Sequence, residues 1–354
     1  MRRAGLAYSL VAKRRRMIVL VLASLLFSTA CISLLLGSAS TPLESLRALT
    51  CLLSHSAGSL ACRVLVEIRL PRIVMAVLAG GCFGVAGCLL QTVLRNPLAS
   101  PYTIGVSSAA SFGAALAIIL GAGVVGWWGS YIVYLNPYLV IANAFFFALI
   151  ASVIVALLAY RYGASPGVVI LAGIAVAYVF QAATSLLQYL GSSEQIAAVV
   201  FWVFGDLGRA EWLDDKITLM VLLAGLATAL AMARMLDALQ ASEEVAYSLG
   251  VNVRLVRTIT LVVASILTAT PTAFIGVIGF IGLLAPHIAR FIIGSKHSYL
   301  VPCSMLTGGI LLLAADTIAR TITQPLILPV GIVTSFMGVP LFLALLVRRG
   351  SRYW

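Results

Sequence analysis

The sequence predicts an all-α polytopic membrane protein with about ten transmembrane helices. Apolar residue types make up 62% of the 354 residues, whereas charged types make up only 10%. A soluble domain contains about 25% charged residues. One membrane span needs ~20 apolar residues, so the apolar content is enough for about ten spans. These proportions exclude an ordinary soluble enzyme, a disordered chain and a collagen-like chain.

Apolar runs bounded by proline, glycine or charged residues divide the chain into ten candidate helices. We expect these helices near residues 17–37, 70–94, 102–122, 137–160, 167–190, 215–235, 257–275, 278–294, 300–318 and 329–347. The divisions between residues 257 and 294 are the weakest, because Pro271, Gly276 and Pro286 interrupt a long apolar stretch. Neighbouring helices can satisfy the backbone groups that such residues free. The stretch therefore either lines a pathway or is simply kinked.

The first apolar run follows a basic segment and in this respect resembles a secretory signal. Lysine and arginine fill residues 13–16, and the apolar run extends from Met17 to Leu36. This run is long enough to span a bilayer, and a long membrane protein follows it. We therefore interpret it as a retained first helix, preceded by a basic N-terminal segment at residues 1–16.

The distribution of lysine and arginine predicts the orientation of the chain. Ten spans place both termini on the same side of the membrane. If that side is the cytoplasm, sixteen of the 23 basic residues lie inside and seven lie outside, in agreement with the positive-inside tendency. The sequence thus predicts a multi-pass protein of the cell membrane, with one domain over residues 1–354 and both termini cytoplasmic. The basic residues are too scattered to form a nucleic-acid-binding patch.

The longest outer connection, residues 38–68, contains Cys51 and Cys62. Extracytoplasmic compartments are oxidising and permit disulfides. The sequence alone leaves open whether these two cysteines are bonded.

The longest inner connection, residues 236–257, carries the signals of a short helix. Ser242 can cap its start, and Glu243 and Glu244 follow in the first turn, where the helix dipole favours negative charge. Gly250 after Leu249 can end it. This helix either binds a partner on the cytoplasmic side or merely closes the connection.

The chemistry that is missing from the sequence narrows the function. No lysine lies in a Gly-Lys-Ser/Thr phosphate loop, so the chain has no Walker A site for ATP. Among the eleven acidic residues, only Asp316 falls within a predicted span, whereas ion-coupled carriers usually need ionisable groups near the midplane. His287 has no second ligand at metal-binding spacing, and no nucleophile has an adjacent base. We therefore expect no catalytic residues, metal site or cofactor, and instead a permease driven by a separate ATPase.

Several segments closely resemble permeases of the FecCD/BtuC family, which are the importer subunits for ferric siderophores, haem and cobalamin. The first group lies around the second helix and reads Arg69-Leu70-Pro71-Arg72, Gly80-Gly81, Arg95-Asn96-Pro97-Leu98-Ala99 and Gly105-Val106-Ser107-Ser108. The second group reads Leu171-Ala172-Gly173-Ile174, Ser248-Leu249-Gly250-Val251, Gly279-Phe280-Ile281-Gly282-Leu283, Pro286-His287, Ala315-Asp316 and Leu328-Pro329-Val330-Gly331. The resemblance covers nearly the whole chain, and its pieces occur in family order.

The resemblance implies a BtuC-like permease fold and a set of partners. It implies a homodimer with the pathway at the two-fold axis, two ATPase subunits inside and a solute-binding protein outside. It also places the ATPase coupling helix in the connection at residues 236–257, with Ser242, Glu243, Glu244, Leu249 and Gly250 as its functional residues. The translocation pathway is expected near Asn96, Pro97, Ser107, Ser108 and Gly173.

The resemblance also implies that three arginines on the outer side dock the binding protein, because arginines at these motif positions of the family meet acidic residues on its two lobes. Arg69 and Arg72 lie at the start of the second helix, and Arg320 ends the ninth. Arginine forks bind carboxylates bidentately, and charge attraction speeds encounter. The alternative is local, because Asp316 lies four residues before Arg320 and can form an ordinary helix ion pair with it.

The cargo cannot be identified from these residues. Family frequency favours a ferric siderophore, with cobalamin, haem and molybdate or tungstate as alternatives. A secondary carrier is the alternative from a different functional class, and an embedded enzyme comes third.

Overall fold

The computed structural model of the chain describes residues 2–36, 60–123, 126–127, 137–162 and 165–349. It is almost entirely helical, and the predicted all-α class is confirmed. Ten helices of the described residues are 13 or more residues long: α1 (Arg2–Leu35), α4 (Leu70–Val93), α5 (Val106–Leu120), α7 (Tyr138–Arg161), α8 (Pro166–Leu190), α10 (Trp212–Ala231), α13 (Val253–Ile275), α14 (Ile281–Ile293), α15 (His297–Thr321) and α16 (Val330–Arg349). Each overlaps one of the ten predicted segments, although α1 begins at Arg2 and not at residue 17.

Short elements connect these helices. They are α3 (Leu60–Arg63), the π-helix η1 (Val64–Arg69), the 3-10 helices η2 (Pro101–Ile104) and η3 (Leu207–Arg209), the strands β1 (Ala122–Gly123) and β2 (Gly126–Trp127), and the helices α9 (Ser193–Val203), α11 (Ala233–Ala241) and α12 (Glu243–Ser248). The two strands pair antiparallel. Helix α9 was not predicted from the sequence. The third helix begins later than predicted, because the left-handed Gly105 (φ 79°) separates η2 from α5.

Not every helix is long enough to cross a bilayer alone. Six helices of the described chain are long and apolar enough to cross it. Helices α10 and α11, which are bent by 57° relative to each other, together form a seventh candidate span. The apolar parts of α5, α14 and α16 are shorter, at Val106–Leu120, Ile281–Ile293 and Val330–Pro340. A positive φ angle at Gly105 breaks the chain before α5. Positive φ angles at Gly276 and Phe280 break it between α13 and α14, within the stretch 257–294 where the predicted divisions were weakest.

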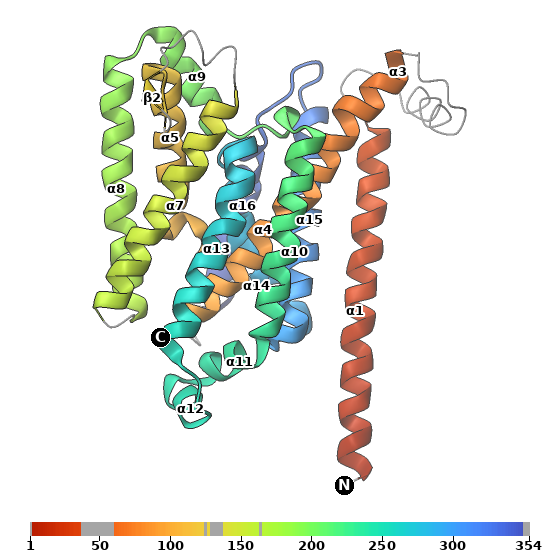
Figure 1. Cartoon of the computed structure of the whole chain (residues 1–354). Helices are drawn as coiled ribbons and strands as arrows, with labels where there is room; N and C mark the ends of the chain where they lie inside the picture. Colours follow the sequence, from red (N-terminus) through yellow and green to blue (C-terminus); the bar gives the residue numbers. More distant parts are fainter. Residues whose placement is uncertain (1, 37–59, 124–125, 128–136, 163–164, 350–354) are drawn as a thin grey trace.

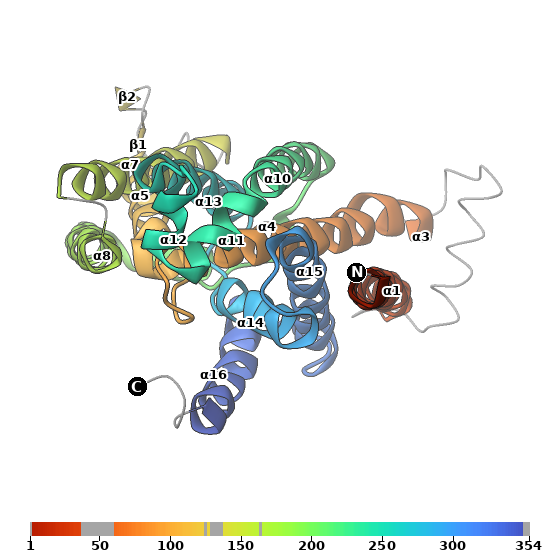
Figure 2. The ribbon, with the colours of Figure 1, turned by 90° about the horizontal axis from the view of Figure 1, so that it is seen from below.

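Helix α4 is the centre of the bundle. In the most apolar 18-residue stretch of the span that contains α4, 89% of the residues are buried, whereas the corresponding share in α1 is 11%. Helix α1 stands at the side of the bundle and packs mainly on α15 (Figure 2). The close contact between α4 and α15 depends on glycine. A Cβ atom at Gly80 or Gly84 would collide with the α15 backbone at Gly308 or Ser304. Small residues permit such close helix packing, so Gly80 and Gly84 allow α4 to approach the α15 backbone directly.

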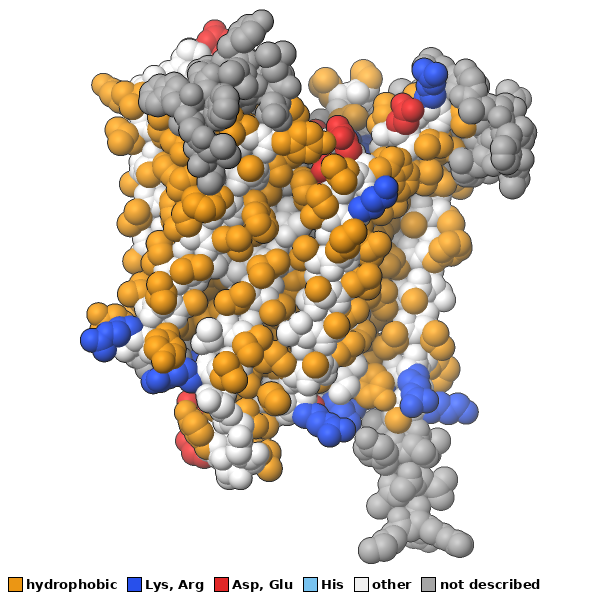
Figure 3. Space-filling view, viewed as in Figure 1, with side chains coloured by type: hydrophobic (Ala, Val, Ile, Leu, Met, Phe, Trp, Pro, Cys, Tyr) orange, Lys and Arg blue, Asp and Glu red, His pale blue; other side chains and the backbone are white. Residues whose placement is uncertain are grey.

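The two ends of the bundle differ. Helices α11 and α12 lie at the end where α1 begins, whereas α3, α9 and η3 lie at the opposite end (Figure 1). On the face drawn in Figure 3, most lysine and arginine side chains gather near the α12 end, and hydrophobic side chains cover the middle. The positive-inside tendency gives such a distribution when the α12 end faces the cytoplasm, and the orientation stays a prediction.

Candidate functional sites at the two ends of the bundle

Residues 233–248 form two short consecutive helices, named here the α11–α12 segment. The capping residues in the sequence account for its local structure. Ser242 has extended backbone angles, and its Oγ accepts a hydrogen bond from Val245 N at 3.0 Å. The Ser242 hydroxyl, the Glu244 backbone and nearby Arg95 lower the pKa of the Glu244 carboxyl. Gly250, with φ of 75°, ends the helix. The short capped helix predicted from Ser242, Glu243, Glu244, Leu249 and Gly250 is therefore present.

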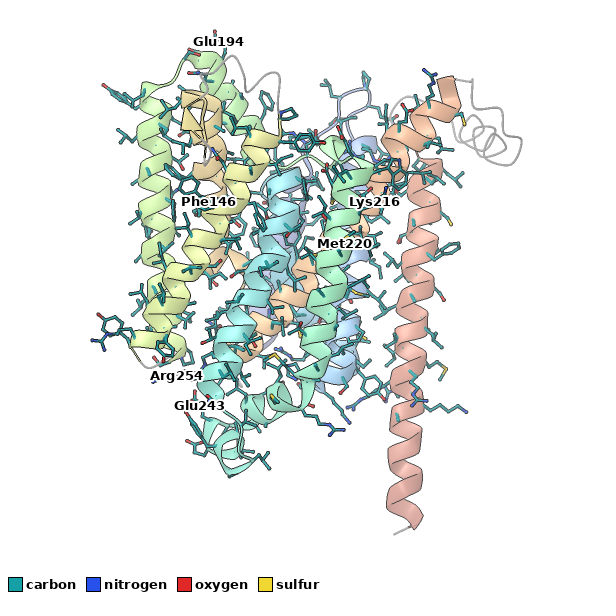
Figure 4. The ribbon with its side chains drawn as sticks, viewed as in Figure 1. Phe146, Glu194, Lys216, Met220, Glu243 and Arg254 are labelled. Carbon is teal, nitrogen blue, oxygen red and sulfur yellow. The ribbon has the colours of Figure 1, made fainter. Side chains whose placement is uncertain are left out.

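Helix α12 presents an apolar surface to solvent. The side chains of Val245, Tyr247 and Leu249 are 43%, 61% and 68% exposed. Leu249 also lines a cavity of about 510 Å³ between α11 and the start of α13. In Figure 4, Glu243 and Arg254 mark this end of the molecule, and Glu194 marks the other. Exposed apolar side chains next to a hollow are typical of a surface that binds another protein.

A buried ion cluster lies toward the opposite end, centred on Asp316 of α15. Arg72 Nε donates to Asp316 Oδ1 at 2.9 Å, and Arg320 Nε donates to Asp316 Oδ2 at 2.9 Å. Arg72 also lies 3.8 Å from Asp206. Arg320 in addition donates to Ser33 Oγ at 2.7 Å and to the Leu36 carbonyl at 3.0 Å, at the end of α1. Asp316 thus joins α15 to α4, and Arg320 extends the cluster to the end of α1.

The predicted docking arginines therefore have different environments. Arg72 is 7% exposed and Arg320 is 4% exposed, and both are bonded within the chain. Arg69, on η1, is half-buried. The local alternative, an ion pair between Asp316 and Arg320, is confirmed. Docking of a partner by these residues stays a prediction, and Arg69 is its most accessible member.

A cavity of about 510 Å³ lies along α16. Its lining is mostly apolar and aromatic, with Tyr102, Phe204 and Phe336 among its residues and no charged side chain among the described ones. None of the predicted pathway residues Asn96, Pro97, Ser107, Ser108 and Gly173 lines it, so their pathway role remains a prediction. Gly173 instead packs against the backbone of Thr103. Tyr102, which lines this cavity, was not predicted as a functional residue, although it lies between the predicted pathway residues Pro97 and Ser107 in the sequence.

The remaining site predictions concern cysteines and metals. Cys62 is disulfide-bonded, and Cys51, with which the sequence left a bond open, lies outside the described residues. Among the described residues, no three His, Cys, Asp or Glu side chains form a group that could hold a metal ion.

The chain is similar to known permeases over most of its length. The model of the FecCD transport family matches residues 22–348. The ferric enterobactin transport system permease FepD of Escherichia coli is 37% identical over 348 residues, which cover 97% of this chain and 98% of FepD. The cobalamin import system permease BtuC of Halobacterium salinarum is 42% identical over 287 residues, which cover 80% of this chain and 73% of that protein.

One solved structure is similar over nearly its whole length. It is described as a metal-chelate type ABC transporter in an inward-facing conformation, with a TM-score of 0.80 and 30% identity over 94% of this chain and 99% of that chain. The match to the family model and the identity to these relatives show that the chain belongs to the FecCD transport family and is a membrane-spanning permease of ABC transporters.

Proposed function

We propose that this chain is the permease of a binding-protein-dependent importer that carries a metal chelate, with a ferric siderophore as the first candidate cargo. FepD, which covers nearly the whole chain, and the metal-chelate type transporter of the same fold support this cargo class. Cobalamin is the second candidate, because the cobalamin permease is 42% identical. Haem remains a further alternative.

The lining of the α16 cavity favours a chelate over a compact oxyanion. Molybdate or tungstate would be held by cationic or multiple N–H donors, and the described lining offers neither lysine nor arginine. Tyr102, Phe204 and Phe336 instead suit a large cargo with apolar and aromatic surface. Weak contacts of this kind allow release, which an importer requires.

The observation that carries the proposal is the exposed apolar surface of α12. We infer that Val245, Tyr247 and Leu249 dock on a separate ATPase subunit, since the sequence has no Walker A site of its own. The full assembly is then a homodimer of this chain with two ATPase subunits on the α12 side and a solute-binding protein at the opposite end. In this arrangement residues 1–16 and 236–257 lie in the cytoplasm.

Uptake assays test the cargo. Cells that lack the chain are supplied with radioactive iron as a ferric siderophore, with haem or with labelled cobalamin, before and after complementation. We expect complementation to restore iron uptake from the siderophore alone. If complementation instead restores uptake of cobalamin or haem, that compound is the cargo. If it restores the uptake of none of the three compounds, the importer function is contradicted.

A further inference from the structure

Two polar links join the α11–α12 segment to consecutive residues at the end of α4. The first link runs from Glu243 through Arg257 to Val93, and the second runs from Asp237 through His297 to Thr92. These links come from different helices, α13 and α15, and meet on the last turn of α4.

The first link is an ion pair between buried Arg257 and partly exposed Glu243, with an additional backbone bond. Arg257 Nη2 lies 2.6 Å from Glu243 Oε1, and Arg257 Nε donates to the Val93 carbonyl at 3.3 Å. The Arg257 side chain is only 2% exposed. A buried guanidinium cannot leave its carboxylate without a large loss of stabilisation. Arg257 thus connects Glu243 to the Val93 carbonyl at the end of α4.

The second link passes through a fully buried histidine. His297 Nδ1 lies 2.7 Å from Asp237 Oδ1, and the His297 backbone N–H donates to the same oxygen at 2.8 Å. His297 Nε2 lies 2.7 Å from Thr92 Oγ1. The His297 side chain has no exposed surface. Asp237 on α11 is thus fastened to the first residue of α15 and, through the imidazole ring, to α4.

The end of α4 leads directly to the cavity. Arg95 has a positive φ of 47°, which ends the helix sharply, and Asn96 N donates back to the Gln91 carbonyl at 3.2 Å. The chain then enters η2, whose Tyr102 lines the cavity along α16. A displacement of Thr92 and Val93 is therefore passed to Tyr102 over a short, hydrogen-bonded stretch.

We propose that Arg257 and His297 are positioning residues that transmit movement of α12 to the end of α4 and so to the cavity around Tyr102. The proposal rests on the proposed function, in which α12 binds the ATPase. Both residues are buried, Arg257 against Glu243 of α12 and His297 against Asp237 of α11, so we expect them to act on coupling and not on ATPase binding itself.

The test uses the assembled transporter in proteoliposomes, with basal ATP hydrolysis and cargo uptake measured on the same preparation. Arg257→Lys keeps the charge but loses the planar fork that binds Glu243 and Val93 together. Thr92→Val removes the hydroxyl that contacts His297 and changes no charge.

For both variants we expect retained ATPase subunits, near-normal basal hydrolysis and a loss of at least about fivefold in cargo transported per ATP. Arg254→Lys is the matched control, because Arg254 lies one turn away on α13 and is exposed.

The double variant Glu243→Arg with Arg257→Glu separates structural from positioning roles. It can restore the ion pair, but a glutamate at position 257 cannot donate to the Val93 carbonyl. We expect this variant to assemble and to remain uncoupled. Full coupling in it, or an unchanged ratio of cargo to ATP in Arg257→Lys or Thr92→Val, would overturn the proposal. If Arg257→Lys does not assemble, Thr92→Val carries the test alone.

A separate variant distinguishes failure of this proposal from failure of the proposed function. Leu249→Asp alters the exposed apolar residue that caps the end of α12 and lines the neighbouring cavity, and Leu249 belongs to neither polar link. If Leu249→Asp retains the ATPase and transports normally, the assignment of α12 as the docking helix is wrong. If it loses the ATPase while Arg257→Lys and Thr92→Val stay coupled, α12 docks the ATPase and the transmission route proposed here is wrong.

Discussion

Arg72 Nε lies 2.9 Å from Asp316 Oδ1, although the two residues are 244 positions apart in the sequence. The pair joins α4 to α15 and is almost completely buried. Asp316 also holds Arg320 at 2.9 Å, so this buried carboxylate is shared by two guanidinium groups, while Asp206 lies 3.8 Å from Arg72. We therefore expect Asp316 to contribute most of the charge balance at this end of the bundle.

We predict that Asp316→Asn strongly destabilises the protein. Removing one partner of a buried ion pair leaves uncompensated charge and costs about 3–5 kcal/mol. The change is measured as the thermal unfolding midpoint of the purified protein in detergent. Glu194→Gln is the control, because Glu194 is exposed at the start of α9. A midpoint for Asp316→Asn equal to that of the control would contradict the structural role of the cluster.

The anchoring of α1 gives a second prediction. Arg320 binds Ser33 Oγ and the Leu36 carbonyl, and α1 has few other buried contacts. A lysine at position 320 cannot reach Asp316 and both α1 groups together. We expect Arg320→Lys to speed amide hydrogen exchange in residues 30–36, with a loss of about 1.5–3 kcal/mol for the hydrogen bonds to the charged group. Exchange that matches the wild type would show that α1 is held by other contacts.

Among the three arginines predicted to dock the solute-binding protein, Arg69 is now the main candidate, because Arg72 and Arg320 are buried. We expect Arg69→Glu to weaken binding of the solute-binding protein by ~0.2–1 kcal/mol, as for an exposed ion pair. The effect should be larger at low salt, because exposed charges are screened beyond ~10 Å at 0.1 M. Arg72→Glu and Arg320→Glu should instead reduce the amount of folded protein. Affinity measurements at two salt concentrations test this, and an Arg69→Glu affinity equal to wild type at low salt would remove Arg69 from the interface.

Labelling of introduced cysteines tests the orientation. The charge distribution places Glu194 and Arg209 outside and Arg161 and Arg254 inside. We expect a membrane-impermeant thiol reagent to modify cysteines at the first two positions in intact cells, and those at the last two only after permeabilisation. Modification of a cysteine at position 254 in intact cells would reverse the orientation.

The sequence was sufficient to locate the ten main helices, because apolar runs and their proline, glycine and charged boundaries act over short distances. It was also sufficient for the α12 cap, where Ser242 and Gly250 lie next to the residues they affect. The partner of Arg72 could not be predicted, because the contact depends on how α4 packs on α15. Helix α9 was missed although Ser192 and Gln195 form a capping box at its start. That signal follows α8 with only one intervening residue.

ATP-driven uptake in proteoliposomes tests the central claim most directly. The chain is reconstituted with its ATPase, and the loaded binding protein is added on the side opposite α12. We predict that labelled ferric siderophore accumulates only when ATP is present on the α12 side, and that Leu249→Asp abolishes accumulation. Accumulation driven by a proton gradient without ATP or the ATPase would contradict the account and identify the protein as a secondary carrier.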